Sequence, residues 1–171
     1  MKRLNKISLG MALLFASAST LAYDGTVNFN GEIVDNACAV SGTTGNSMIV
    51  LMDAVNKSSF SSGRGVVAAT TPFTLTLTNC PTTNARVRFE GTQADGYPDA
   101  LAISGGAKGV GIQLYNQDMS KLPLYTASNY YQLQEENEAN ELNFYASYVA
   151  TGAAIEPGPA NASANFTISY N

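Results

Sequence analysis

The chain has 171 residues, with 9 Lys and Arg, 13 Asp and Glu, 2 Cys, no His and no Trp. Charged residues make up 13% of it, about half the share of roughly 25% that is usual in globular domains. Because His is the most common general base and a frequent zinc ligand, its absence makes most enzyme and metal-site classes poor candidates. A hydrophobic content of 45% excludes a disordered chain. The length suits one domain with a single core.

The first segment has the pattern of an export signal. Its basic residues are Lys2, Arg3 and Lys6. An apolar stretch follows from Ile7 to Ala16, and then the small-x-small sequence Thr20-Leu21-Ala22. This order predicts a secretory signal peptide over residues 1–22, cut after Ala22. The alternative is an uncleaved membrane anchor, although the apolar stretch is shorter than the roughly 20 residues that a span needs. Losing the basic segment leaves an acidic mature chain, which excludes a nucleic-acid partner.

Cys38 and Cys80 are the only cysteines. Because export takes them to an oxidising compartment, we predict a disulfide between them. In the chain-entropy model a loop of this length contributes about 4 kcal/mol to stability. The alternatives are two free thiols or a metal site, for which no His is available to complete the ligands of zinc.

Several stretches alternate apolar and polar residues, which is typical of half-buried strands. They cover residues 25–34, 73–78, 86–90, 110–114, 142–148 and 164–170. A short strand is also expected at 49–51, loops at 41–47 and 56–70, and a turn from Gly152 to Pro159. No stretch sustains a helical period. The sequence therefore predicts an all-β sandwich of about seven strands.

The first of these strands begins just after the predicted cleavage site. Val27, Phe29, Gly31 and Ile33 share one face of it, and polar residues occupy the other. A disulfide at Cys38 would hold the chain just downstream, so we expect residues 23–35 to form a free arm. Because an isolated strand is unstable, the arm should pair with an exposed sheet edge. The alternative is an ordinary first strand within its own sheet.

Five stretches occur in an order that resembles a known family. They are the arm GTVNFNGEIV with Cys38-Ala39-Val40 after it, LTLTNC ending at Cys80, Val110 to Leu114, FYASYVATG from Phe144, and the ending ANFTISYN. Together they resemble type 1 fimbrial (pilin) subunits of the chaperone–usher pathway, in a major-pilin-like form, over essentially the whole mature chain. Tyr170 is the penultimate residue and Gly158 stands fourteenth from the C-terminus, as the family's assembly motif requires.

The resemblance implies an incomplete immunoglobulin-like β-sandwich over residues 36–171 that lacks its last strand. Residues 23–35 would be an N-terminal donor-strand extension. Its apolar residues Val27, Phe29 and Ile33 would enter pockets of a neighbouring subunit, with Gly31 at the position of the family's glycine. Donor-strand complementation of this kind is a known form of strand addition.

The resemblance also implies the acceptor side and the partners. Phe166, Ile168 and Tyr170 would border the open groove and take part in capture by a chaperone, and Gly158 would lie near the far end of the groove. The expected partners are neighbouring pilin subunits, a periplasmic fimbrial chaperone and an outer-membrane usher. The expected location is a fimbria on the bacterial surface, reached through the periplasm.

Other motifs do not indicate chemistry. The glycine-rich stretch 105–111 with Lys108 lacks the spacing of a phosphate-binding loop and predicts a turn. The acidic cluster lacks the spacing of a calcium loop and predicts a solvated loop; it comprises Glu135, Glu136, Glu138 and Glu141. We therefore expect no cofactor and no catalysis, but a structural subunit that supports adhesion. The alternative is a self-contained secreted β-sandwich that binds carbohydrate.

Overall fold

The computed structural model describes residues 27–28, 38–41, 47–61, 63–80, 83–134, 138–152 and 154–171. The chain divides into two compact units, Met1–Ile33 and Val34–Asn171. In the first unit only Val27 and Asn28 are described, and both are exposed. The rest of the expected strand at 25–34 lies outside the described residues. Within the described part, no helix is long and apolar enough to cross a membrane.

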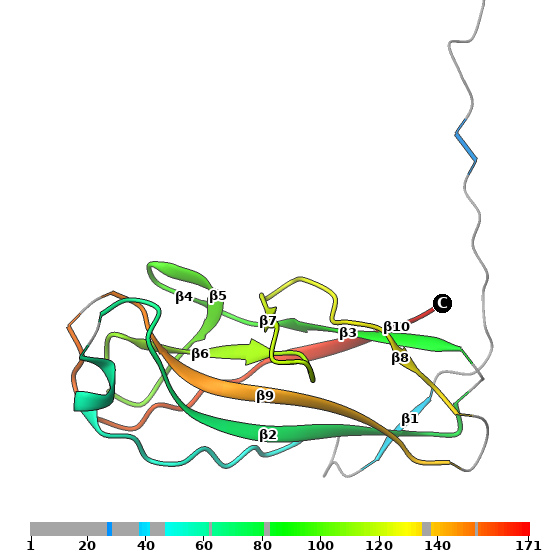
Figure 1. Cartoon of the computed structure of the whole chain (residues 1–171), viewed down its shortest axis with the longest axis horizontal. Coiled ribbons are helices and arrows are strands. Elements are labelled where there is room, and N and C mark those ends of the chain that lie inside the picture. The colour runs from blue at the N-terminus through cyan, green and yellow to red at the C-terminus, as the bar shows by residue number, and fades with distance from the viewer. Residues whose placement is uncertain are drawn as a thin grey trace, which may run out of the picture. The chain divides into compact units, whose positions relative to one another are not determined.

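Two antiparallel sheets build the second unit (Figure 1). The larger is seven-stranded, with the order β1-β2-β9-β6-β5-β4 and with β7 paired to β6. Its strands are β1 (Ala39–Ser41), β2 (Val67–Thr78), β4 (Gln93–Ala94), β5 (Tyr97–Ala102), β6 (Val110–Tyr115), β7 (Lys121–Leu122) and β9 (Asn140–Ala150). The smaller has the order β10-β3-β8, formed by β3 (Asn84–Glu90), β8 (Tyr131–Gln132) and β10 (Asn165–Tyr170). The expected all-β sandwich is confirmed.

The two longest strands, β2 and β9, lie side by side and supply much of the core. Leu75 pairs with Leu142 and Phe73 with Phe144, while Thr74, Thr76 and Thr78 point to the other face. Alternation of this kind places one apolar face inward, as the sequence predicted. β3 and β10 match the strands expected at 86–90 and 164–170.

Aromatic rings join the two sheets across the core. Phe144 of β9 is fully buried, and its ring meets that of Phe89 of β3 edge-on, with 5.2 Å between the centroids. Phe73 stacks on Phe144 at 5.5 Å. Offset-stacked and edge-on pairs are the favourable aromatic geometries, so this cluster fixes the spacing of the layers near the middle of the sandwich.

The structure corrects four expectations. β2 begins at Val67, inside the loop expected over 56–70, because a bulge between Ala68 and Thr70 hides the alternation. A 3-10 turn, η1 (Lys57–Phe60), also lies there. All six residues of β6 are buried, not half of them, and Gly111 of β6 lies directly against Ala94 of β4 and Ala100 of β5. The described residues form ten strands instead of about seven, since four strands of two or three residues lack a readable period.

The fourth correction concerns residues 49–51, which belong to no strand. The segment Met48–Val55 makes no backbone hydrogen bond to any other described residue. Its residues from Ser47 to Asp53 nevertheless alternate between exposed and half-buried. Side-chain contacts with the core, and not a hydrogen-bonded ladder, therefore hold this segment in place.

We expect stability to fall at high pH because of Tyr131. Burial raises the pKa of this phenol to about 12, and its hydroxyl donates a hydrogen bond to the backbone oxygen of Asn143 at 2.6 Å. The folded state thus keeps a proton that the unfolded state loses near pH 10. The stabilisation is complete below about pH 10 and is lost as pH rises toward about 12. Urea unfolding across this range should show a shallower loss for Tyr131→Phe; an equal loss would contradict the assignment.

Candidate functional site

The C-terminal strand β10 has an open edge. One edge pairs with β3 along the whole strand, from Asn165 opposite Glu90 to Tyr170 opposite Ala85. The other edge pairs with no strand of the described part of the chain (Figure 1). Unpaired N–H and C=O groups along such an edge are a template for another strand. The inward side chains of β10 are only half-buried, so the core beneath this edge is incompletely covered.

A groove begins at the start of this edge, between residues 160–166, which include the first two residues of β10, and the segment Met48–Met52. Its volume is about 680 Å³. Apolar side chains of both sheets form its floor, among them Phe73 and Leu75 of β2 and Phe89 of β3. None of the described residues that line it is charged. The groove therefore suits the apolar side chains of an extended strand better than a charged or strongly polar ligand.

A second cavity of about 300 Å³ continues the groove, since both are lined by Met52, Tyr148 and Ala160. Gly158 lies in its wall. A Cβ on Gly158 would come within 2.6 Å of the backbone nitrogen of Ala107, so only glycine lets the two backbones approach this closely.

The segment that carries Gly158 is held against residues 104–108. Antiparallel bridges join Ser104 to Asn161 and Lys108 to Glu156, and the side chains of the second pair form an exposed ion pair at 2.9 Å. Gly105 and Gly106 both have positive φ, which confirms the turn that the glycine-rich stretch predicted. Two backbones fixed to each other thus form one wall of the second cavity.

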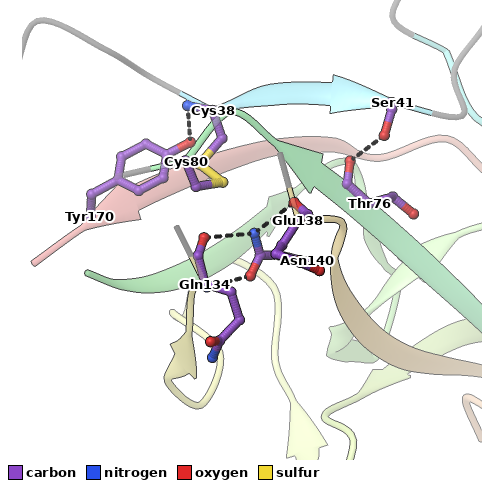
Figure 2. Close-up of a disulfide and its surroundings, with 8 residues drawn as sticks. All are labelled: Cys38, Ser41, Thr76, Cys80, Gln134, Glu138, Asn140 and Tyr170. Atoms are coloured by element: carbon purple, nitrogen blue, oxygen red, sulfur yellow. Dashed lines mark hydrogen bonds between the residues drawn. A yellow bond between two sulfur atoms is a disulfide. The ribbon is translucent and has the colours of Figure 1, made fainter. Parts of the chain in front are cut away.

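The predicted disulfide between Cys38 and Cys80 is confirmed, with 4.5 Å between the Cα atoms (Figure 2). It lies beside the C-terminal end of β10. The hydroxyl of Tyr170 accepts a hydrogen bond from the backbone N–H of Cys38 at 3.2 Å. Burial raises the pKa of Tyr170, opposed in part by this hydrogen bond. The end of β10 is thereby tied to the start of β1.

The structure separates the residues expected to border the groove. Phe166 lines it, whereas Ile168 and Tyr170 pack against the core nearer the disulfide. Gly158 lies in the second cavity. Of the expected donor residues, Val27 belongs to the first unit; Phe29, Gly31 and Ile33 lie outside the described residues.

Sequence reasoning missed the wall formed by Met48–Met52. The run MIVLM is apolar on both faces, so it has no alternation that would distinguish a groove wall from a core strand. The same holds for residues 160–164, whose small alternating Ala, Asn and Ser gave no strong signal.

The acidic cluster is only partly described. Glu138 and Glu141 are exposed, and Glu141 lies on β9 and not in a loop; Glu135 and Glu136 fall outside the described residues. Buried Asn140 closes the loop by hydrogen bonds with the backbone of Gln134 and Glu138 (Figure 2). Among the described residues, no group of three or more His, Cys, Asp or Glu is placed to hold a metal ion.

Comparison with known proteins agrees with this architecture. The family model described as "Fimbrial protein" matches residues 27–171. The chain belongs to the fimbrial protein family. It is 33% identical over 171 residues to the major fimbrial subunit SMF-1 of Stenotrophomonas maltophilia, covering 93% of this chain and 99% of that one. To the F17 fimbrial protein of Escherichia coli it is 35% identical over 175 residues, covering 95% and 96%.

A solved structure shares both the fold and much of the sequence. The type I fimbria protein of Burkholderia pseudomallei has a TM-score of 0.62 and 36% identity, covering 80% of this chain and 91% of that one. Subunits of chaperone–usher pili with solved structures have the same immunoglobulin-like fold. The chain is thus a structural pilin subunit of a surface fimbria, from a family that is not an enzyme family. The carbohydrate-binding alternative is not favoured.

We expect Gly158→Ala to destabilise the pilin. Its φ lies outside the left-handed region, so the penalty is steric and comes from the backbone of Gly106 and Ala107. A shift of this kind costs about 1–3 kcal/mol, measured as the free energy of unfolding in urea. Glu156→Ala on the same segment is the matched control, because it removes only an exposed ion pair worth under about 1 kcal/mol. Equal effects of both would contradict the close-approach argument.

The hydroxyl and the ring of Tyr170 should each contribute to the free energy of unfolding. Tyr170→Phe removes the acceptor of the Cys38 N–H and should cost about 0.5–1.5 kcal/mol in urea unfolding. Tyr170→Ala also removes the ring that packs on the core, and should cost about 2 kcal/mol or more. A Tyr170→Ala variant as stable as the wild type would contradict a stabilising role for this residue at the end of β10.

Proposed function

We propose that the groove accepts the N-terminal arm of a neighbouring subunit, while this subunit's own arm fills the groove of the next. Copies would polymerise in this way, by donor-strand exchange, into a fimbria that supports cell adhesion. The observation that carries the proposal is the free edge of β10 beside an uncharged apolar groove. An inserted strand would hydrogen-bond to that edge and bury its apolar face on the floor.

The arm has the pattern that this groove needs. Val27, Phe29 and Ile33 alternate with polar residues, and Gly31 gives a position where backbones can approach closely. From Val27 to Ile33 an extended chain spans about 20 Å, close to the length of the six-residue strand β10. An arm antiparallel to β10 would carry Ile33 toward the second cavity, where Gly158 lies.

We expect the contact between an inserted arm and the groove to be strong. Burying three apolar side chains contributes about 1.5–3 kcal/mol each, and the new hydrogen bonds add to this, for a gross gain of about 5–10 kcal/mol. That is comparable to the whole stability of a domain. A subunit with an unfilled groove should therefore be marginally stable, and the assembled fibre hard to dissociate.

The marginal stability of a subunit with an empty groove also bears on how the fibre is assembled. A chain with an open apolar groove would aggregate unless something covers the edge during export. We propose that residues 1–22 direct export, that a periplasmic chaperone lends a strand to the groove of residues 36–171, and that the outer-membrane usher exchanges it for the arm of residues 23–35. Phe166, Ile168 and Tyr170 would present the edge on which the chaperone acts. The disulfide at Cys38 would anchor the base of the arm.

Strand complementation tests the proposal directly. Residues 36–171 should melt at a much higher temperature when a copy of residues 25–34 is appended after Asn171 through a short flexible linker. Phe29→Asp in the added copy should abolish the gain, because it places a charge in an uncharged groove. Thr26→Asp in the added copy is the matched control, since it lies on the polar face. No gain, with the unappended chain already stable, would exclude the mechanism.

A further inference from the structure

We propose that Met48 and Met52 are a site of oxidative modification, at which conversion to the sulfoxide stops an open groove from accepting a strand. The sequence has five methionines, and Met1 and Met11 fall in the segment predicted to be removed on export. Of the other three, Met48 and Met52 line the groove, whereas Met119 lies between β6 and β7 and outside the groove lining. The inference rests on the proposed function, because it concerns the state of the groove before a strand enters.

The two side chains can be reached while the groove is open. Met48 and Met52 are half-buried, since each packs on the main core and also borders the groove. A thioether on a flexible, unbranched side chain at such a position is open to small oxidants. The two residues alternate with the exposed Ile49 and Leu51, so they share the inward face of the wall. A strand inserted in the groove would therefore cover both of them.

The reaction needs an oxygen-donating two-electron oxidant, such as hydrogen peroxide. A lone pair of the thioether sulfur attacks one peroxide oxygen, so that the S–O bond forms while the O–O bond breaks and hydroxide leaves. The hydroxide then takes the proton from the oxygen now bound to sulfur. The products are one sulfoxide and one water, with the sulfur oxidised by two electrons and the peroxide reduced by two.

A sulfoxide at either position would change the character of the groove. The described lining has no charged residue, and its floor is formed by apolar side chains such as Phe73, Leu75 and Phe89. The sulfoxide oxygen is polar, and an inserted strand would bury it beside apolar surface and remove it from water. Met48 and Met52 stand at the two ends of the wall, so oxidation of both would place such an oxygen at each end. Oxidation would therefore weaken strand binding, while a bound strand would protect both sulfurs.

Peroxide treatment followed by peptide mass spectrometry tests the protection. Residues 23–171 are used with a copy of residues 25–34 appended after Asn171, and Phe29→Asp in the chain's own arm keeps chains from filling one another's grooves. Met48 and Met52 should then oxidise several-fold more slowly than Met119, whose side chain is 48% exposed. When the added copy also carries Phe29→Asp, the rates at Met48 and Met52 should rise several-fold, and the rate at Met119 should not change.

A reporter separates an open groove from an unfolded chain. Leu142 is fully buried on β9, and Leu142→Met nearly conserves its volume, so the sandwich should tolerate it. Oxidation at Met48 and Met52 that is faster than at the reporter supports the proposal. Rates that rise only in step with the reporter would mean that peroxide attacks unfolded chains alone, and rates unaffected by a strand that raises the melting temperature would mean that the groove gives no protection. Either result overturns the proposal.

Oxidation of the unfolded chain tests the consequence for strand binding. In urea, peroxide reaches all of the methionines, and after quenching and refolding the melting temperature is measured with and without the added strand. Most of the gain that the strand gives should be lost in the oxidised wild type and in the oxidised Met119→Leu variant. The gain should persist in the variant that carries Met48→Leu and Met52→Leu together, because its groove holds no thioether.

The same gain, or the same loss, in all three oxidised chains would overturn the proposal. Failure of the proposed function is distinguishable from this, because the added strand would then give no gain in melting temperature even before oxidation.

Discussion

The structure depends on the open edge of β10. This strand stands at the end of its sheet, so it has hydrogen-bond partners on one side only, and its inward side chains are half-buried. Backbone groups left unpaired beside apolar surface are costly, and a strand from outside removes both costs at once. A sandwich that omits one strand is therefore an incomplete molecule by itself and a specific receptor for the strand it lacks.

The parts of the groove are held with different rigidity. At one end the disulfide and the hydrogen bond from Cys38 to Tyr170 tie β10 to β1. At the other, Gly158 packs directly on the backbone of Ala107. Between them the wall Met48–Met52 has no hydrogen bond to other described backbone, and two of its inward residues are flexible methionines. Fixed ends with an adaptable wall suit a site that must first be empty and later hold a strand.

Prediction from the sequence succeeded where one face of a strand is apolar and the other polar. β3, β9, β10 and the second half of β2 were expected at their places, and so was the disulfide. It failed for β4, β5, β7 and β8, which are too short or too uniform to show a period. It also treated residues 49–51 as a strand, because an apolar run does not say whether a hydrogen-bonded neighbour is present. In the candidate site it identified Phe166 and Gly158 but not the opposite wall.

The sequence by itself determined the all-β class, the cysteine pair and membership of the fimbrial family, because these depend on local periodicity, on residue identity and on the order of motifs. Only the tertiary structure decided that the edge of β10 away from β3 is open, that the groove beside it has no charged residue among its described lining, and that Ile49 and Leu51 are exposed. Pairing and burial are set by segments far apart in the chain. A pattern within one segment shows which face is apolar, but only the packed sandwich shows what covers that face.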